Sequence, residues 1–169
     1  MRELRAGQLV LEPLRVSHAD AMFKVLREPT LYRYLDHPPP PSVEHLQAVY
    51  GRLEKRKSPD GADHWLNWVV RESKGPPIGF VQATVMPGGN AWIAYVIAVA
   101  RQRHRLGTLA TALMVDHLAS DYGVKRFLAS VEAENAPSIR LLERLGFALA
   151  SPEVAKEHEL SKSERLYVR

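Results

Sequence analysis

The order of helical and strand-like segments in this sequence predicts an α+β fold. Three strand-like runs, at 65–72, 78–86 and 91–99, follow one another with only short turns between them, which is the pattern of an antiparallel meander. An amphipathic helical run at 107–122 and a further strand-like run at 124–133 come next. The centre of the chain is therefore expected to contain a strand–helix–strand crossover that joins the meander to a second group of elements.

The start of the chain is expected to contribute one more strand and a helix. Residues 7–15, with the sequence GQLVLEPLR, have the pattern of an opening strand. Ser17 followed by Asp20 resembles a capping box, and it predicts a helix that continues to about Arg27.

An irregular segment should separate this helix from the next one. Residues 28–41, EPTLYRYLDHPPPP, cannot continue a helix because of their proline run. Ser42 is expected to begin a second helix that extends to about Lys57. Residues 58–64, SPDGADH, form a loop that leads into the meander.

The segment 130–147, SVEAENAPSIRLLERLGF, is expected to end a strand and begin a short helix. Pro137 suits the first helical turn, and Gly146 suits a C-terminal cap. Asn135 and Ser138 have an ordinary explanation at such a place, because their side-chain oxygens accept unpaired backbone N–H groups. On local evidence alone, a purely structural role is the simpler one. The core face of this helix recurs at helical spacing and consists of Ile139, Leu142 and Leu145.

Length and composition indicate one folded unit. A closing strand is expected at 165–169, and neither a repeat nor a long linker divides the chain, so residues 1–169 are predicted to form a single domain. A domain of 169 residues can bury a continuous core without disulfides or metal ions. The sequence contains no cysteine, which excludes disulfide frameworks, thiolate nucleophiles and cysteine-based zinc sites, and no metal is expected.

Hydropathy and charge limit the partners. Residues 1–15 lack the apolar run of a signal peptide, and no run approaches membrane-spanning length, so a cytoplasmic protein without a membrane partner is expected. The net charge of +4 and the pI of about 9.5 suit an anionic ligand. The densest basic stretch, ARQRHRLG at 100–107, is too short and too poor in aromatic residues for a nucleic-acid surface. Its number of basic side chains suits a ligand with a few phosphate charges.

That basic stretch lies where a strand should end and a helix should begin. Such a turn directs backbone N–H groups and the positive end of the helix dipole at one point, which favours an anion. Gly107 lets the anion approach the backbone closely, and Thr108 and Ala110 are small neighbours. Positive charge around it is expected from three arginines, Arg101, Arg103 and Arg105.

Together with the segment around Asn135, this stretch resembles the acetyl-CoA-binding half of the GNAT acetyltransferase superfamily. The similarity is closest to the RimJ/RimL-like branch, whose best-known members acetylate the N-termini of ribosomal proteins. It implies a mixed, mostly antiparallel central sheet flanked by helices, with the acetyl-CoA site on the β-α-β crossover. The matching pieces are IAYVIAVARQRHR, RLGTLATAL, GVKRFLASVEAENAPSIRLLERLGF and, more loosely, LVLEPLRVSHADAMFKVLREP.

The resemblance implies a loop that binds the pyrophosphate of acetyl-CoA. In the family this loop reads Arg or Gln, two residues, Gly, one residue, then Gly or Ala. In this sequence the motif aligns with residues 105–110, but Thr108 stands where the family usually has Gly, and Gly107 lies one position before it. The alignment of the motif with this loop is therefore fixed only to within one residue. The residues that the resemblance assigns to acetyl-CoA in this loop are Arg105, Leu106, Gly107, Thr108, Leu109 and Ala110.

The resemblance also implies how the rest of acetyl-CoA is held. Its pantetheine arm is expected to lie like an added strand beside Ile97, Ala98 and Val99, with Asn135 contacting it from the other side. A neutral amine would attack the acetyl carbonyl directly, so no enzyme nucleophile is required. A backbone N–H near Ala98 or Val99 is expected to stabilise the oxyanion. Ser138 is the family-matched donor to the departing thiolate.

The sequence does not assign the general base. Related sequences often carry Glu in the central strand where this chain has Trp92, which cannot accept a proton. The alternatives are water, Glu132, His64 and His37, and both histidines could equally be solvated residues. Three aromatic residues could line the acceptor pocket or belong to the core, namely Tyr32, Tyr34 and Trp92.

The sequence therefore predicts an N-acetyltransferase that uses acetyl-CoA as cosubstrate and acts on a primary amine. The missing Glu and the altered loop leave a second hypothesis, a non-catalytic acyl-CoA-binding or sensor domain of the same fold. A nucleic-acid-binding module would need a recognition helix or an aromatic sheet motif, and the sequence has neither. The acceptor could be a protein N-terminus, a polyamine, an amino acid or an antibiotic amine, and the oligomeric state is open.

Overall fold

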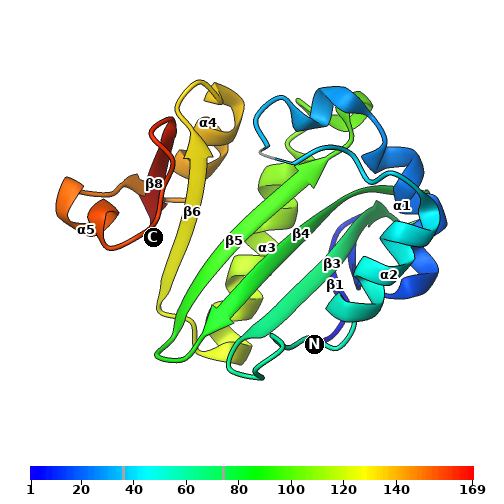
Figure 1. The fold of residues 1–169 in the computed structure, drawn as a ribbon, viewed down its shortest axis with the longest axis horizontal. Helices are drawn as coiled ribbons and strands as arrows, with labels where there is room; N and C mark the ends of the chain where they lie inside the picture. Colours follow the sequence, from blue (N-terminus) through cyan, green and yellow to red (C-terminus); the bar gives the residue numbers. More distant parts are fainter. Residues whose placement is uncertain (36, 74) are drawn as a thin grey trace.

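The computed structural model describes residues 1–35, 37–73 and 75–169, and its strands form one eight-stranded sheet in the order β1-β2-β3-β4-β5-β6-β8-β7 (Figure 1). Asp36, in the predicted irregular segment, and Lys74, in the first turn of the predicted meander, lie outside the described residues. The strands span Leu4–Ala6 (β1), Leu9–Pro13 (β2), His64–Glu72 (β3), Pro77–Met86 (β4), Asn90–Ile97 (β5), Arg126–Glu132 (β6), Ala148–Leu149 (β7) and Glu164–Val168 (β8).

Helices cover both faces of this sheet. Among the described residues, short 3-10 helices span Val16–His18 (η1), Pro29–Tyr32 (η2) and Val99–Arg101 (η3). The α-helices span Ala19–Leu26 (α1), Val43–Leu53 (α2), Leu106–Tyr122 (α3), Ala136–Arg144 (α4) and Pro152–Lys156 (α5). Figure 1 shows α3 on one face of the sheet and α1 with α2 on the other.

The predicted α+β fold is confirmed. Strands β2 to β5 pair antiparallel in sequence order, and β5 then pairs parallel with β6 after the crossover through α3. The parallel pairing is the consequence of that crossover, because a helix returns the chain to the end at which the previous strand began. β8, predicted from RLYVR, pairs antiparallel with β6.

The opening strand is shorter than predicted and is part of a hairpin. Gly7 has φ +58 and, with Gln8, turns the chain between β1 and β2, so the expected single strand is two strands. The predicted capping box at Ser17 is wrong, because Ser17 lies inside η1. The N–H of Arg15 is accepted instead by Nδ1 of His18, at 3.1 Å.

The second helix begins where predicted and ends early. The Ser42 hydroxyl accepts the N–H of His45 at 3.2 Å, as an N-cap does. The helix ends at Leu53 rather than near Lys57, because Arg56 adopts φ +60 and cannot continue it. The chain after Lys57 then returns to the sheet, with a bridge between Lys57 and His64.

Two elements near the C-terminus were not predicted. β7 has two residues and α5 has five, and both are too short to produce a period in the sequence. α5 does carry a local start signal, since Ser151 accepts the N–H of Val154 and Pro152 follows it.

Two apolar clusters hold the helices against the sheet. The larger one includes Met114 and Leu118 of α3, Leu142 of α4 and Ile97 of β5. The smaller one joins Met22 of α1, together with residues of α2, to the opposite face. In the described part of the chain, no helix is long and apolar enough to cross a membrane.

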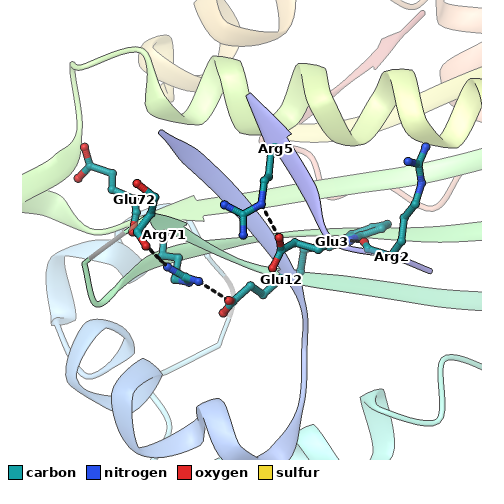
Figure 2. Close-up of polar contacts among 8 residues, drawn as sticks. Arg2, Glu3, Arg5, Glu12, Arg71 and Glu72 are labelled. Carbon is teal, nitrogen blue, oxygen red and sulfur yellow. Dashed lines mark hydrogen bonds and ion pairs between the residues drawn. The ribbon is translucent and has the colours of Figure 1, made fainter. Parts of the chain in front are cut away.

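Charged side chains on and beside the first three strands pair with one another (Figure 2). Arg71 of β3 donates to Glu12 of β2 at 2.6 Å and to the carbonyl of Ser73 at 2.7 Å. The hydrogen bond from Arg71 lowers the pKa of the Glu12 carboxyl below its ordinary value. Arg5 and Glu3 form a further ion pair at 2.6 Å.

Candidate active site

Strands β5 and β6 pair only at their N-terminal ends. The ladder joins Asn90, Ala91 and Trp92 to residues 126–128, and the two strands then separate, as Figure 1 shows. Beyond this point β5 continues to pair with β4 as far as Ile97, while β6 pairs with β8. We call this opening the β5–β6 splay. Along it, the edge of β5 that faces β6 has no strand partner among the described residues, so its main-chain groups can bind an extended ligand.

The strand ends two residues earlier than predicted. Ile97 is the last residue of β5, and Ala98 already caps the 3-10 helix η3. The Ala98 N–H donates to the carbonyl of Ile78 at 2.7 Å, so it is not available to an oxyanion. Val99 begins η3, where the N–H has no partner within the helix. Of the two donors expected near this point, Val99 is therefore the one that remains.

Two side chains reinforce the turn after β5. Gln102 donates from Nε2 to the carbonyl of Ile97 at 3.0 Å. Arg101 forms an ion pair with Glu72 at the end of β3, so its charge is not directed at an anion as the sequence suggested. Arg101 instead fastens the turn to the sheet. Arg103 and Arg105 are the remaining cations of the predicted set.

The loop before α3 has the backbone geometry of an anion site. Arg103 and Arg105 both adopt positive φ, of 65° and 60°, although neither is glycine. Such left-handed residues in a turn bring successive N–H groups to one side. Residues that hold this conformation without being glycine are concentrated at functional sites.

The start of α3 limits which N–H groups an anion can use. The helix begins at Leu106, and the first hydrogen bond of the helical pattern runs from the Leu109 N–H to the Arg105 carbonyl at 3.0 Å. The N–H groups of Leu106, Gly107 and Thr108 precede it and have no helical partner. Leu109 and Ala110, which the resemblance also assigned to the loop, have their N–H groups inside the helix. Ala110 is moreover fully buried.

Gly107 packs closely against the neighbouring elements. A Cβ at this position would lie 3.2 Å from Cδ1 of Leu141 in α4 and 3.3 Å from Cγ1 of Ile97 in β5. The glycine therefore brings the start of α3 against both sides of the splay. A hollow of about 370 Å³ lies beside this helix start and is lined by His104, Arg105, Leu106, Thr108, Leu109 and Ala112.

Asn135 caps α4, as its structural explanation predicted. Its Oδ1 accepts the N–H of Ser138 at 3.2 Å. The Nδ2 group of Asn135 makes no hydrogen bond to the described residues, so a single side chain can cap the helix and still donate to a ligand. The capping role and the ligand role of Asn135 are compatible.

Ser138 contacts a tyrosine that sequence reasoning missed. Its Oγ lies 2.6 Å from the hydroxyl of Tyr95, which belongs to β5 on the other side of the splay. The Tyr95 hydroxyl oxygen also lies 3.3 Å from the Ser138 carbonyl oxygen, which is the more distant of the two contacts. Burial raises the pKa of Tyr95 to about 12. In the sequence, Tyr95 is an aromatic residue between the apolar positions 93 and 97, which is typical of a core residue.

The structure separates the candidate bases. Glu132 ends β6 and accepts the hydroxyl of Ser163 at 3.1 Å. His64 begins β3 and pairs with Val85, so it lies at the end of the sheet opposite the splay, and the structure removes it as a base. His37 packs its ring edge-on against Tyr32, at 5.5 Å between ring centres, with Nδ1 beside the Pro38 carbonyl.

Two of the three aromatic candidates contact residues that are distant in sequence or belong to a neighbouring element. Tyr32 donates to the Leu26 carbonyl at 2.7 Å, and Trp92 packs edge-on against His158 of the α5 region at 5.2 Å. The third, Tyr34, lines a hollow of about 230 Å³ at the C-terminal end of β6. That hollow brings the irregular segment after α1 together with the end of β6, and its lining residues are Arg33, Tyr34, Leu35, Glu132 and Glu134. The described residues contain no cluster of side chains suited to a metal ion.

Comparison with known proteins identifies the class to which this fold belongs. A family model described as an acetyltransferase (GNAT) domain matches residues 8–148, which is most of the chain. The chain therefore belongs to the GNAT acetyltransferase family and is an acyltransferase. No curated protein matches the sequence.

Solved structures share the whole architecture. RimL, a ribosomal L7/L12 α-N-protein acetyltransferase in complex with coenzyme A, has a TM-score of 0.82 at 19% identity, over 99% of this chain and 97% of that chain. RimJ of Mycobacterium smegmatis in complex with CoA-disulfide has a TM-score of 0.78 at 22% identity, over 99% and 85%. The microcin C7 self-immunity acetyltransferase MccE, in complex with acetyl-CoA and AMP, has a TM-score of 0.80 at 16% identity, over 97% and 93%. In fold, the chain is a RimJ/RimL-like GNAT domain.

Proposed function

We propose that this chain transfers the acetyl group of acetyl-CoA to a primary amine, through direct attack of the neutral amine on the acetyl carbonyl. One observation carries the proposal. The unpaired N–H groups at the start of α3, the unpaired edge of β5 and the hydroxyl of Ser138 meet at the β5–β6 splay. A diphosphate, an extended amide-bearing arm and a thioester need these three kinds of group in this order.

Binding would be divided among the main chain and two arginines. The N–H groups of Leu106, Gly107 and Thr108 suit the pyrophosphate, and the positive end of the helix dipole adds to their effect. Arg105, which lines the hollow beside this helix start, and Arg103 in the same loop would supply positive charge. The arm would pair with the edge of β5 up to Ile97, and Asn135 would donate to it from Nδ2.

The chemistry needs an oxyanion donor and proton transfers at two places. The Val99 N–H is the donor that suits the developing oxyanion. Ser138 would donate to the sulfur as the C–S bond breaks, and the amine proton would pass to water or to Glu132. The attack requires no covalent enzyme intermediate, so the principal task of the chain is to hold two reactants in the correct orientation.

The hollow beside Glu132 suits the acceptor amine. It lies where the irregular segment after α1 meets the end of β6, and it combines two carboxylates with the ring of Tyr34. Its two carboxylates outnumber the guanidinium of Arg33 at the wall, so they favour an amine that arrives protonated and gives up one proton before it attacks in the neutral form. A protein N-terminus and a small-molecule amine both satisfy this condition, so the acceptor is proposed as an amine of either kind.

The experiment is an acceptor screen with acetyl-CoA that follows the release of free thiol. The panel should contain N-terminal peptides, polyamines, amino acids and aminoglycosides, and acetylated products should be confirmed by mass. Release that depends on one class of amine supports the proposal. Trp92, which replaces the frequent Glu of the family, favours the alternative of a non-catalytic acyl-CoA-binding domain. Tight binding of acetyl-CoA without transfer to any amine would establish that alternative.

A further inference from the structure

Ser138 can act on the departing thiolate only if its hydroxyl hydrogen points into the splay. A serine hydroxyl rotates freely about its C–O bond, so a neighbouring group must fix the direction of its hydrogen. In the described part of the chain, the side-chain partner within reach of Ser138 Oγ is the hydroxyl of Tyr95, at 2.6 Å. Tyr95 comes from β5 and Ser138 from α4, so this bond spans the two walls of the splay.

We infer that Tyr95 is a positioning residue that donates its O–H to Ser138 Oγ and thereby directs the hydrogen of Ser138 toward the leaving sulfur. The inference rests on the function proposed above. A phenol is a stronger acid than an alcohol, with an ordinary pKa of about 10, so it is the better donor in a bond between the two. With its oxygen accepting from Tyr95, Ser138 has its own hydrogen available to a third group.

Two features keep Tyr95 in this role. Burial raises its pKa to about 12, so the phenol stays neutral and remains a donor throughout the working range of an enzyme. Its hydroxyl oxygen also lies 3.3 Å from the Ser138 carbonyl oxygen, but its one hydrogen is directed to Oγ, the closer acceptor at 2.6 Å. The ring packs against the larger apolar cluster, which holds the hydroxyl in place.

The reaction does not consume the proton of Tyr95. The N–C bond forms and the C–S bond breaks, while the amine nitrogen releases one proton to water. Ser138 passes its hydrogen to sulfur and takes one back from that water. Tyr95 keeps its own hydrogen, so the net reaction yields one amide and one thiol without any oxidant or further reactant.

The test replaces Tyr95 with phenylalanine, which keeps the ring and removes the donor. In steady-state transfer to the amine found in the screen, Tyr95→Phe should lower kcat on the order of 10-fold, a part of the ~10²–10⁴-fold typical of general acid–base catalysis. KM for acetyl-CoA should change little, because Tyr95 acts through Ser138. Tyr122→Phe is a matched control, since Tyr122 packs against the same cluster at the far end of α3.

A double variant shows whether Tyr95 acts through Ser138. Ser138→Ala alone should be slow, and Tyr95→Phe with Ser138→Ala should be no slower than that. Wild-type kcat in Tyr95→Phe overturns the inference, and so does a second, multiplicative loss in the double variant. If the wild-type chain transfers to no amine, the proposed function itself fails, and the inference fails with it. Thiol release by the wild type therefore distinguishes the two failures.

Discussion

Replacing Gly107 with proline tests the anion site at the start of α3. The change removes one of three N–H groups without helical partners, at Leu106, Gly107 and Thr108. A hydrogen bond to a charged group contributes about 1.5–3 kcal/mol, so the dissociation constant for acetyl-CoA should rise about 10- to 150-fold. Pro137 already occupies the second position of α4, so proline at the equivalent position of α3 is compatible with a folded helix.

A matched variant isolates the loss of the donor. Gly107→Ala keeps the N–H, and its Cβ would lie 3.2 Å from Cδ1 at the end of the Leu141 side chain and 3.3 Å from Cγ1 of the buried Ile97, so both neighbours must shift by a few tenths of an ångström. Alanine gains helix propensity of up to about 1 kcal/mol, which offsets part of this crowding. Calorimetric titration with acetyl-CoA should show a much larger loss for proline than for alanine, with thermal melting as the control. Equal affinities in two folded variants would refute the anion site.

Four further changes test the remaining parts of the site and the fold. Asn135→Ala should weaken acetyl-CoA binding by about 1–3 kcal/mol and stability by about 1 kcal/mol, and lower stability with unchanged affinity in calorimetry would return Asn135 to a capping role alone. Ser138→Ala should slow single-turnover transfer by ~10²–10⁴-fold with little change in acetyl-CoA affinity, and a variant that melts normally and transfers at the wild-type rate removes Ser138 from the catalytic group. Glu132→Gln should slow transfer more than Glu134→Gln, its neighbour in the same hollow, if Glu132 accepts the amine proton; equal rates assign that proton to water. Glu12→Gln should lower the melting temperature at neutral pH, but it should have little effect at a pH well below the ordinary carboxyl pKa of 4.5. The reason is that a carboxyl whose pKa is lowered in the folded state stabilises the fold above its unfolded pKa, and this stabilisation is lost as the pH falls through the folded pKa. A difference in melting temperature that stays constant across pH would contradict this prediction.

The sequence by itself determined most of the regular elements. Alternation in the meander and the helical period of α3 are long enough to identify strands and a helix, and the order of elements then requires the crossover. Local chemistry was equally informative at Ser42 and Asn135, because an N-cap is an interaction within four residues. The resemblance to the GNAT family rested on such contiguous segments, and the family match at 8–148 confirms it.

Only the tertiary structure decided what each side chain of the site contacts. Arg101 looked like part of a phosphate cluster, but its partner is Glu72, which is distant in sequence and adjacent in the sheet. Tyr95 looked like a core residue, and its contact with Ser138 exists because β5 and β6 separate after three paired residues. These contacts depend on strand register and on the packing of helices across the sheet, and neither has a period or a spacing in the sequence.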